Sequence, residues 1–509
     1  MLLVEQFPVL IVTVGVFLAY TILLAGWVNK KLPFYLCFAT ISAQLVMAIF
    51  ILRHVLTVGV IHYWLGGWRP PWGIEYVMDA LNGYVLVVLL FLSLMCVLYS
   101  KRSILHKIEE RKVVTFYTIY QLMVSGLCGV VVTGDVFNMY VLFEVASLTS
   151  YALVASAGGK ALKASFNYLV LGSIGICIYL LGVGFLYSVT GTLNMGDLRI
   201  LLPPLYGNRM VQAAFAFILA GFGIKMALFP FHTWLPDAHA YAPAEISAML
   251  SGIIIEVGTY AFLRISFSVF TVEFLKQLPI FEVISWLAAV AMIYGSVLAI
   301  AQYNLKRMLA YSSVANMGYI MLAVGLSTST HSALWGGLTP ALMHILNHTL
   351  MKACMFLAAG AFIYKFDLWD IADFRGLGRK MPYTCAAFTL AAVSMIGVPP
   401  SVGFVSKLYI ILAALDAGKF MFVAVMLLST LLNLVYFWRV IEMLYMRREE
   451  GEESHSSSSK DEIPLSMLIP ILTLASLCII VGILWLTEIP LPILDQVNAL
   501  FGLGVYATP

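Results

Sequence analysis

The sequence predicts an all-α membrane protein that crosses the bilayer many times. Of its 509 residues, 62% are hydrophobic and only 11% are charged, whereas soluble domains carry roughly 25% charged residues. Apolar stretches of roughly 20 residues, the length that spans a bilayer as a helix, also recur along the whole chain. This composition excludes a soluble enzyme, a disordered chain and a secreted disulfide scaffold. The net charge of +3 gives no support for binding nucleic acid.

About fourteen such segments are expected to be transmembrane helices, because backbone in contact with lipid must satisfy its own hydrogen bonds. They begin near Phe7, Pro33, Val77, Val113, Val136, Ala164, Val211, Ala244, Pro279, Met308, Ser332, Tyr383, Phe420 and Pro464. If the N-terminus faces outward, the loops on the cytoplasmic side hold 18 of the 29 Lys and Arg residues, as the positive-inside rule requires. The sequence therefore predicts a multi-pass protein of the cell membrane with both termini outside.

Prolines close to lysines indicate that two of these segments are broken helices. Pro230 follows Lys225 in the seventh segment, and Pro399 and Pro400 precede Lys407 in the twelfth. Proline has no backbone N–H, so a carbonyl one turn earlier loses its donor. The carbonyls freed in this way are expected to be those of Met226, Met395 and Ile396. Broken helices at membrane depth are tolerated only against protein or water-filled cavities, so a lysine beside such a break can meet water.

The two broken segments lie five segments apart, which predicts an internal repeat. A unit of five spans is odd in number, so two successive copies must have opposite orientations, as in many transporters. The predicted organisation is helices one to three in 1–100, a first five-helix repeat in 101–270, an inverted second repeat in 271–446, a polar cytoplasmic loop in 447–463 and the last helix in 464–509.

Ionisable side chains inside apolar segments are the candidate functional residues, because each costs about 2.5–3.5 kcal/mol to insert. They are Glu144, Lys225, Glu256, Lys407 and, spaced four apart on one face of the eleventh segment, His344, His348 and Lys352. Burial disfavours the charged form of a lysine, and a carboxylate on a neighbouring helix favours it. Moving that carboxylate, or its charge, would switch the lysine between holding and releasing a proton. The pattern therefore predicts a proton relay.

Three further intramembrane cations are interpreted as structural. Arg53 and Arg264 lie toward segment ends, from which long side chains reach the interface, and Arg439 has Glu442 one turn away. No cofactor or metal is expected: the seven cysteines are scattered and include no CxxC pair. Haem ligation is disfavoured, because two histidines four apart on one helix cannot occupy both faces of one iron.

Five motifs in the same order along the chain carry a resemblance to a known family. They are TGDVFNMYVLFEVASLTSYALV, FPFHTWLPDAHAYAPAEISAMLSG, KRMLAYSSVANMGYI, HILNHTLMKACMFLAAG and GVPPSVGFVSK. Together they resemble the antiporter-like subunits shared by respiratory complex I, Mrp-type sodium/proton antiporters and membrane-bound hydrogenases. The resemblance implies that Glu144 and Lys225 form the key pair of a first half-channel and that Lys407 serves the second. The histidine pair of the eleventh segment would then be His344 and His348.

The chain departs from this family at one position. Many members have a lysine where this sequence has Glu256. The central relay would then run with reversed charge, with Lys352 or a histidine as the partner of Glu256, or the two half-channels would be less well connected.

The stretch GGWRPPWGIEYVMD, from Gly66 to Asp79, resembles the Mrp D-type and hydrogenase branches more than complex I itself. The implied partners are antiporter-like and small Mrp-like membrane subunits, with a hydrogenase or quinone-reductase module as a further alternative, and the implied cargo is the proton, with or without exchange for sodium. Redox chemistry would belong to partner subunits of such an oxidoreductase complex. Two other functions are weighed against this one: a stand-alone secondary solute transporter and a haem- or quinone-binding redox subunit.

Overall fold

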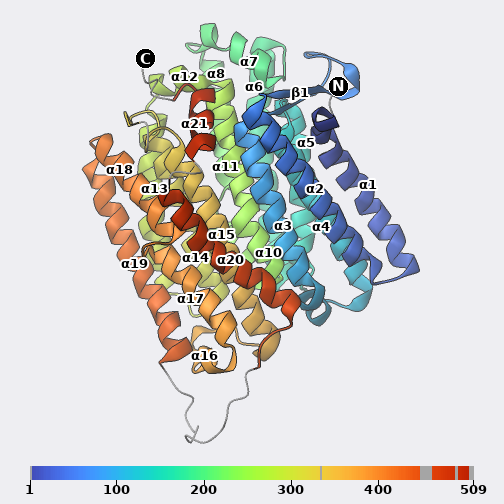
Figure 1. Cartoon of the computed structure of the whole chain (residues 1–509). Helices are drawn as coiled ribbons and strands as arrows, with labels where there is room; N and C mark the ends of the chain where they lie inside the picture. The colour runs from blue at the N-terminus through green and yellow to red at the C-terminus, as the bar shows by residue number, and fades with distance from the viewer. Residues whose placement is uncertain (1–2, 333–334, 447–460, 488–490, 504–509) are drawn as a thin grey trace, which may run out of the picture.

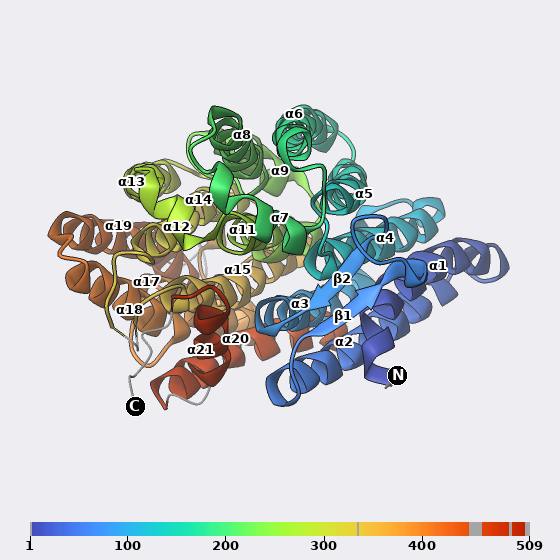
Figure 2. The same ribbon diagram turned by 90° about the horizontal axis from the view of Figure 1, so that it is seen from above.

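The computed structural model describes residues 3–332, 335–446, 461–487 and 491–503, and within these ranges the chain is a helical bundle with one two-stranded sheet (Figures 1 and 2). The first elements are α1 (Phe7–Val28), α2 (Leu32–Thr57), β1 (Ile61–Trp64), β2 (Glu75–Met78) and α3 (Ala80–Lys107). The two strands are antiparallel, with Ile61 opposite Met78. The third predicted segment began near Val77, but that residue lies in β2, and the helix begins at Ala80 because the Asp79 side chain caps it.

The middle of the chain contains the helices that carry the first group of candidate ions. They are α4 (Val113–Val132), α5 (Val136–Ala155), α6 (Lys160–Thr190), α7 (Met195–Leu201), α8 (Arg209–Lys225), α9 (Leu235–Tyr241), α10 (Ala244–Met249), α11 (Ile255–Arg264) and α12 (Thr271–Gln277). Helices α10 and α11 form one continuous span through a π-helical turn at Leu250–Ile254, and a second π-helical turn, Ile265–Val269, extends α11.

The remaining elements carry the second group of candidate ions. They are α13 (Ile280–Ile300), α14 (Leu305–Leu326), α15 (Thr339–Phe366), α16 (Leu377–Lys380), α17 (Pro382–Ile396), α18 (Val402–Asp416), α19 (Phe420–Tyr445), α20 (Leu465–Leu486) and α21 (Leu491–Leu500). Helix α20 runs obliquely across the bundle and packs against α3, α15, α17 and α18, so it contacts both the beginning and the end of the fold (Figure 1). Of the predicted polar loop 447–463, residues 447–460 lie outside the described ranges.

Twelve helices within the described ranges are long and apolar enough to cross a membrane. This confirms a polytopic all-α protein. The seventh and twelfth predicted segments are the two that do not reach this length, because α8 ends at Lys225 and α17 ends at Ile396. In both places the chain leaves the helix and then resumes helical structure in α9 or α18. Both predicted helix breaks are therefore present, and the count of fourteen spans stays a prediction.

Two short joints of the same design fasten the bundle at opposite ends. In the first, Asp135 pairs with Asn194 in an antiparallel bridge at the start of α5, and the N–H of Val136 donates to the carbonyl of Leu193 (2.9 Å). In the second, Asn304 pairs with Asp370 at the start of α14, and the next residue donates to Trp369 (3.1 Å). Asp135 and Asn304 also cap their helices in the same way, each accepting from the N–H three residues later.

These joints are five spans apart and lie on opposite sides of the molecule. Helix α7, which follows the first joint, is at the top of Figure 1, and α16, which follows the second, is at the bottom. Inverted five-helix copies produce this arrangement, so the joints support the predicted repeat independently of the proline breaks.

Two of the candidate-ion helices, α11 and α15, lie at the centre of the bundle together with α14 (Figure 2). In the most apolar stretch of the span 244–269, 100% of the residues lie inside the bundle. The corresponding share is 94% for α14 but only 33% for each of α1, α2 and α19. The view along the bundle shows α11, α14 and α15 surrounded by the other helices (Figure 2). Glu256 and the three candidate residues of α15 are therefore surrounded by protein and not by lipid.

Candidate functional site

The first lysine is held by hydroxyl groups of α5 at the broken end of α8. Lys225 is the last residue of α8, and its Nζ donates to Ser147 Oγ (2.8 Å) and to the Tyr151 hydroxyl (3.4 Å). Glu144 lies one turn before Ser147 on the same helix and is half-buried. Lys225 itself is buried. Because no carboxylate lies within 4 Å of Lys225 in the described ranges, Glu144 acts on the ammonium at longer range, and a rearrangement of α5 would change that interaction.

The break after Lys225 is compatible with a stable fold because a side chain replaces part of the lost hydrogen bonding. The indole N–H of Trp234 donates to the carbonyl of Ile224 (3.0 Å), at the C-terminal end of α8. Ala227 adopts a left-handed conformation (φ 52°), which turns the chain away from the helical path. Pro230 and the 3₁₀ turn Phe231–Trp234 then lead into α9. The helix end beside Lys225 is thus defined by the local sequence.

The three candidate residues of α15, which are His344, His348 and Lys352, contact α11, α14 and α18. His348 Nδ1 and Glu256 Oε1 of α11 are 2.6 Å apart. One helical turn earlier, His344 Nδ1 lies 2.9 Å from Ser406 Oγ of α18, and its Nε2 lies 3.2 Å from Asn316 Oδ1. All of these side chains are almost completely buried. His348 and His344 of α15 therefore connect α11, the helix of Glu256, with α18, the helix that carries Lys407.

The partner of Glu256 is a histidine, one of the two alternatives that the sequence left open. A hydrogen bond of 2.6 Å between a carboxyl and an imidazole lets the pair share one proton. The other oxygen of Glu256 and Nε2 of His348 have no hydrogen-bond partner within the described ranges. Lys352, one turn further along α15, donates to the carbonyl of Leu309 (2.8 Å) and to the hydroxyl of Ser312.

The second lysine binds carbonyls that the proline break releases. Lys407 Nζ donates to Met395 O (2.7 Å) and to Ile396 O (3.4 Å), the two carbonyls expected from the sequence to lose their helical donors. The ammonium also lies 4.9 Å from the centre of the Tyr319 ring. Lys407 therefore rests on partial negative charges of the backbone and of an aromatic face, where Lys225 rests on hydroxyl groups.

A second buried polar cluster was missed by the sequence reasoning. Glu245 and Lys306 are completely or almost completely buried. Glu245 Oε2 accepts from Ser103 Oγ (3.2 Å), and Lys306 donates to Ala242 O (2.6 Å). Nearby, the ring of His239 stacks on Phe356 at 4.7 Å, and neither of its nitrogens has a hydrogen-bond partner in the described part of the chain.

This cluster is next to a small cavity that opens toward the end of the bundle. The cavity has a volume of about 30 Å³ and is lined by Ser103, Lys107, Ala244 and Tyr364, among others. A water molecule needs roughly 10–15 Å³ of such volume, so the cavity can hold water beside the residue that binds Glu245. Lys306 is easily taken for a loop cation because Arg307 follows it. The available signal was its position at the first turn of an apolar helix.

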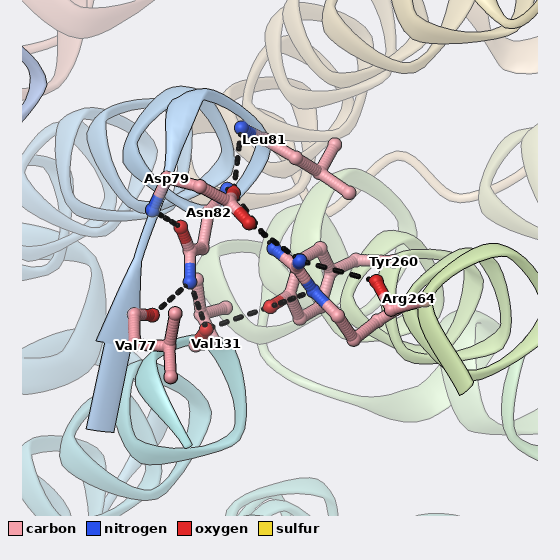
Figure 3. Close-up of polar contacts among 8 residues, drawn as sticks. Val77, Asp79, Leu81, Asn82, Val131, Tyr260 and Arg264 are labelled. Atoms are coloured by element: carbon pink, nitrogen blue, oxygen red, sulfur yellow. Dashed lines mark hydrogen bonds and ion pairs between the residues drawn. The ribbon is translucent and has the colours of Figure 1, made fainter. Parts of the chain in front are cut away.

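Arg264 is buried in an ion pair with Asp79 (Figure 3). The two guanidinium nitrogens are 2.6 Å and 2.8 Å from the two carboxylate oxygens of Asp79, and Nε donates to the Tyr260 hydroxyl (3.3 Å). Asp79 also caps α3 by accepting from the N–H groups of Leu81 and Asn82. Arg264 was expected to be structural, and this geometry agrees with an ion pair and not with a side chain that reaches into the interface. Arg439 donates to the carbonyls of Ile300 and Gln302.

The chain is similar to known membrane proteins in both sequence and fold. Residues 133–433 match the family described as NADH:quinone oxidoreductase/Mrp antiporter, TM. The chain is 42% identical to NADH-quinone oxidoreductase subunit N of Desulforudis audaxviator, covering 94% of this chain and 95% of that one. It is 31% identical to a Na(+)/H(+) antiporter subunit of Alkalihalophilus pseudofirmus, covering 87% of each. Its fold is similar to that of a chain in the membrane-bound sulfane sulfur reductase, an archaeal respiratory membrane complex. The TM-score is 0.88 at 28% identity, and the match covers 97% of this chain and 98% of that one.

Proposed function

The chain belongs to the NADH:quinone oxidoreductase/Mrp antiporter family, and from this premise we propose that its buried ions carry protons across the membrane. It is an antiporter-like subunit, and the proteins that it resembles are subunits of multisubunit membrane complexes. The proposed route is Glu144 and Lys225, then Glu256 with His348 and Lys352, and then His344 with Lys407.

The observation that carries this proposal is that two histidines of α15 contact two different neighbouring helices, α11 and α18. His348 is 2.6 Å from Glu256, and His344 is 2.9 Å from Ser406, the residue before Lys407. On the proposed route, a proton that reaches Glu256 passes to His348, then to His344 one helical turn away on α15, and so to the helix that carries Lys407. Each transfer changes the charge felt by the next group, and such interactions are strong where water is excluded.

The buried Glu245 and Lys306 extend the route toward the cation-rich face. We assign this face to the cytoplasm, with both termini outside in the cell membrane, because 18 of the 29 Lys and Arg residues are predicted to lie on it. The water-sized cavity beside Ser103 would then supply protons from that side. The repeats 101–270 and 271–446 would each contribute one broken helix with a lysine beside the break.

The described contacts favour a relay over haem binding. Three of the four ring nitrogens of His344 and His348 lie within hydrogen-bonding distance of Ser406, Asn316 and Glu256, so these three nitrogens already have polar partners from the protein. Any redox step of the host complex would belong to its other subunits. The exchanged ion is the proton, with sodium as the counter-ion in an Mrp-type host.

The test is proton transport by variants in membrane vesicles, followed with a pH-sensitive dye. Lys225→Ala and Glu144→Gln should abolish transport, while the variant chains should still co-purify with their partner subunits. The matched control is Lys276→Ala, because Lys276 is an exposed lysine outside the candidate route. Loss of assembly in both variants would show that these ions are structural, and normal transport with intact assembly would also refute the proposal.

A further inference from the structure

A basic cavity lies away from the proposed proton route, at the end of the bundle where most Lys and Arg residues gather. Its volume is about 370 Å³, and four of its lining residues are the cations Lys30, Lys31, Lys101 and Arg102. The first two lie in the short connection between α1 and α2, and the other two lie in the last turns of α3. The connection is at the lower end of the α1–α2 hairpin in Figure 1.

The charges in this cavity are poorly balanced by the protein. Lys30 is 3.5 Å from Glu110, and both side chains are exposed (59% and 72%). Lys31, Lys101 and Arg102 have no carboxylate within 4 Å in the described ranges. The amine of Lys101 instead lies 5.0 Å from the centre of the Phe34 ring. Four like charges around one cavity repel each other, so a bound anion would lower the energy of this arrangement.

The surroundings of the cavity are suited to an anion with hydrocarbon chains. At the adjoining end of α1, Leu24, Trp27 and Val28 are exposed by 56%, 81% and 84%. Leu105 of α3, which also lines the cavity, is exposed by 54%. Tyr35, on the cavity wall, is an amphipathic aromatic residue of the kind that gathers at headgroup level. Positive groups thus occur at the membrane surface, with apolar side chains next to them on the lipid side.

We propose that this basic cavity binds the phosphate headgroup of an anionic phospholipid. Basic pockets between transmembrane helices on the cytoplasmic side are suited to such headgroups, and the volume is within the range of small-ligand sites, roughly 300–1,000 Å³. The phosphate would lie among Lys31, Lys101 and Arg102, and the acyl chains would run along the exposed apolar residues of α1. The lipid would then link the α1–α2 connection to the end of α3.

The test compares lipids that differ only in headgroup charge. The full chain, purified in detergent with its co-purifying subunits, is titrated with phosphatidylglycerol, with phosphatidylcholine of the same acyl chains, and with inorganic phosphate. Retained lipid is measured by native mass spectrometry, and stability is measured as the thermal unfolding midpoint. Phosphatidylglycerol should be retained and should raise the midpoint more than either of the other two probes.

A triple variant and a charge-matched control assign the effect to the cavity. Each cation near an anionic lipid contributes about 1 kcal/mol, so Lys31→Gln with Lys101→Gln and Arg102→Gln should weaken phosphatidylglycerol binding by about 100-fold at low salt, and Lys101→Gln alone by about 5-fold. The control replaces exposed cations of the same face outside the cavity and should bind as the wild type does. Its substitutions are Lys160→Gln, Lys163→Gln and Arg379→Gln.

Three outcomes would overturn the proposal. One is equal stabilisation by the two lipids, since headgroup charge would then be irrelevant. Another is equal loss in the triple variant and its control, since the general charge of this face would then be responsible. The third is an effect of inorganic phosphate as large as that of phosphatidylglycerol, which would indicate a site for a soluble anion. The single Lys101→Gln variant keeps the test valid if the triple variant does not fold.

Discussion

Neutralising one partner of the Asp79–Arg264 ion pair should destabilise the protein, and neutralising both should cost clearly less than the sum of the two single changes. The two hydrogen bonds between these side chains, of 2.6 Å and 2.8 Å, join residues that are almost completely buried. Removing one partner of such a pair costs about 3–5 kcal/mol because an unpaired charge stays buried, whereas replacing both partners is often close to neutral. Asp79→Asn is the informative change, because asparagine still caps α3.

The assay is a double-mutant cycle on the free energy of unfolding in mixed micelles. Asp79→Asn and Arg264→Met should each lose about 3–5 kcal/mol, and the double variant should lose clearly less than their sum. The control is Lys419→Gln, which removes an exposed pair with Glu282 (3.6 Å) and should cost about 0–1 kcal/mol. The reasoning is refuted if Asp79→Asn costs no more than Lys419→Gln, or if the double variant loses the full sum.

Three further changes test other parts of the structure. Gly221→Ala would place a Cβ 2.6 Å from the carbonyl oxygen of Gly175 on the neighbouring helix α6, and it should lower the free energy of unfolding by about 1–3 kcal/mol. The control is Gly184→Ala, because a Cβ at Gly184 meets open space, and this variant should be nearly neutral in the same measurement. The hydrogen bond to Glu75 raises the pKa of His62 above its usual 6.5. Burial by itself raises the pKa of Glu75, but the hydrogen bonds that Glu75 accepts, chiefly from His62, outweigh burial and lower this pKa below 4.5. The His62→Gln variant should therefore lose most stability at pH values between these two pKa values. The loss should shrink at higher pH, where His62 deprotonates, and at lower pH, where Glu75 protonates. A difference in thermal midpoint that does not change with pH would contradict this. Asn304→Ala removes the cap of α14 and should cost about 1 kcal/mol, while Asn304→Asp, which keeps a capping oxygen, should leave the midpoint nearly unchanged.

The features that could be predicted from the sequence are those that depend on near neighbours in the chain. Apolar length indicated the spans, and the missing N–H groups of Pro399 and Pro400 indicated which carbonyls would be free. In the structure Lys407 binds those two carbonyls, a contact that the sequence analysis did not predict.

Contacts between distant residues could not be predicted in the same way. Asp79 and Arg264 are 185 positions apart, and Glu256 and His348 are 92 apart. Each residue type and its place on a helix face can be read from the sequence, but the pairing depends on how the helices pack. Glu245 and Lys306 were missed for a related reason. Both lie near segment ends, where a charged side chain usually reaches water, and only the tertiary structure shows that they are enclosed.

The matching joints at Asp135 and Asn304 have a consequence for how the two halves of the proposed route compare. Because the backbone is built in the same way at both places, the scaffold gives the two halves little to distinguish them. The halves differ instead in the side chains and carbonyls around their lysines, which are hydroxyls at Lys225 and bare carbonyls at Lys407. Any unequal affinity of the two lysines for a proton would therefore originate in those surroundings.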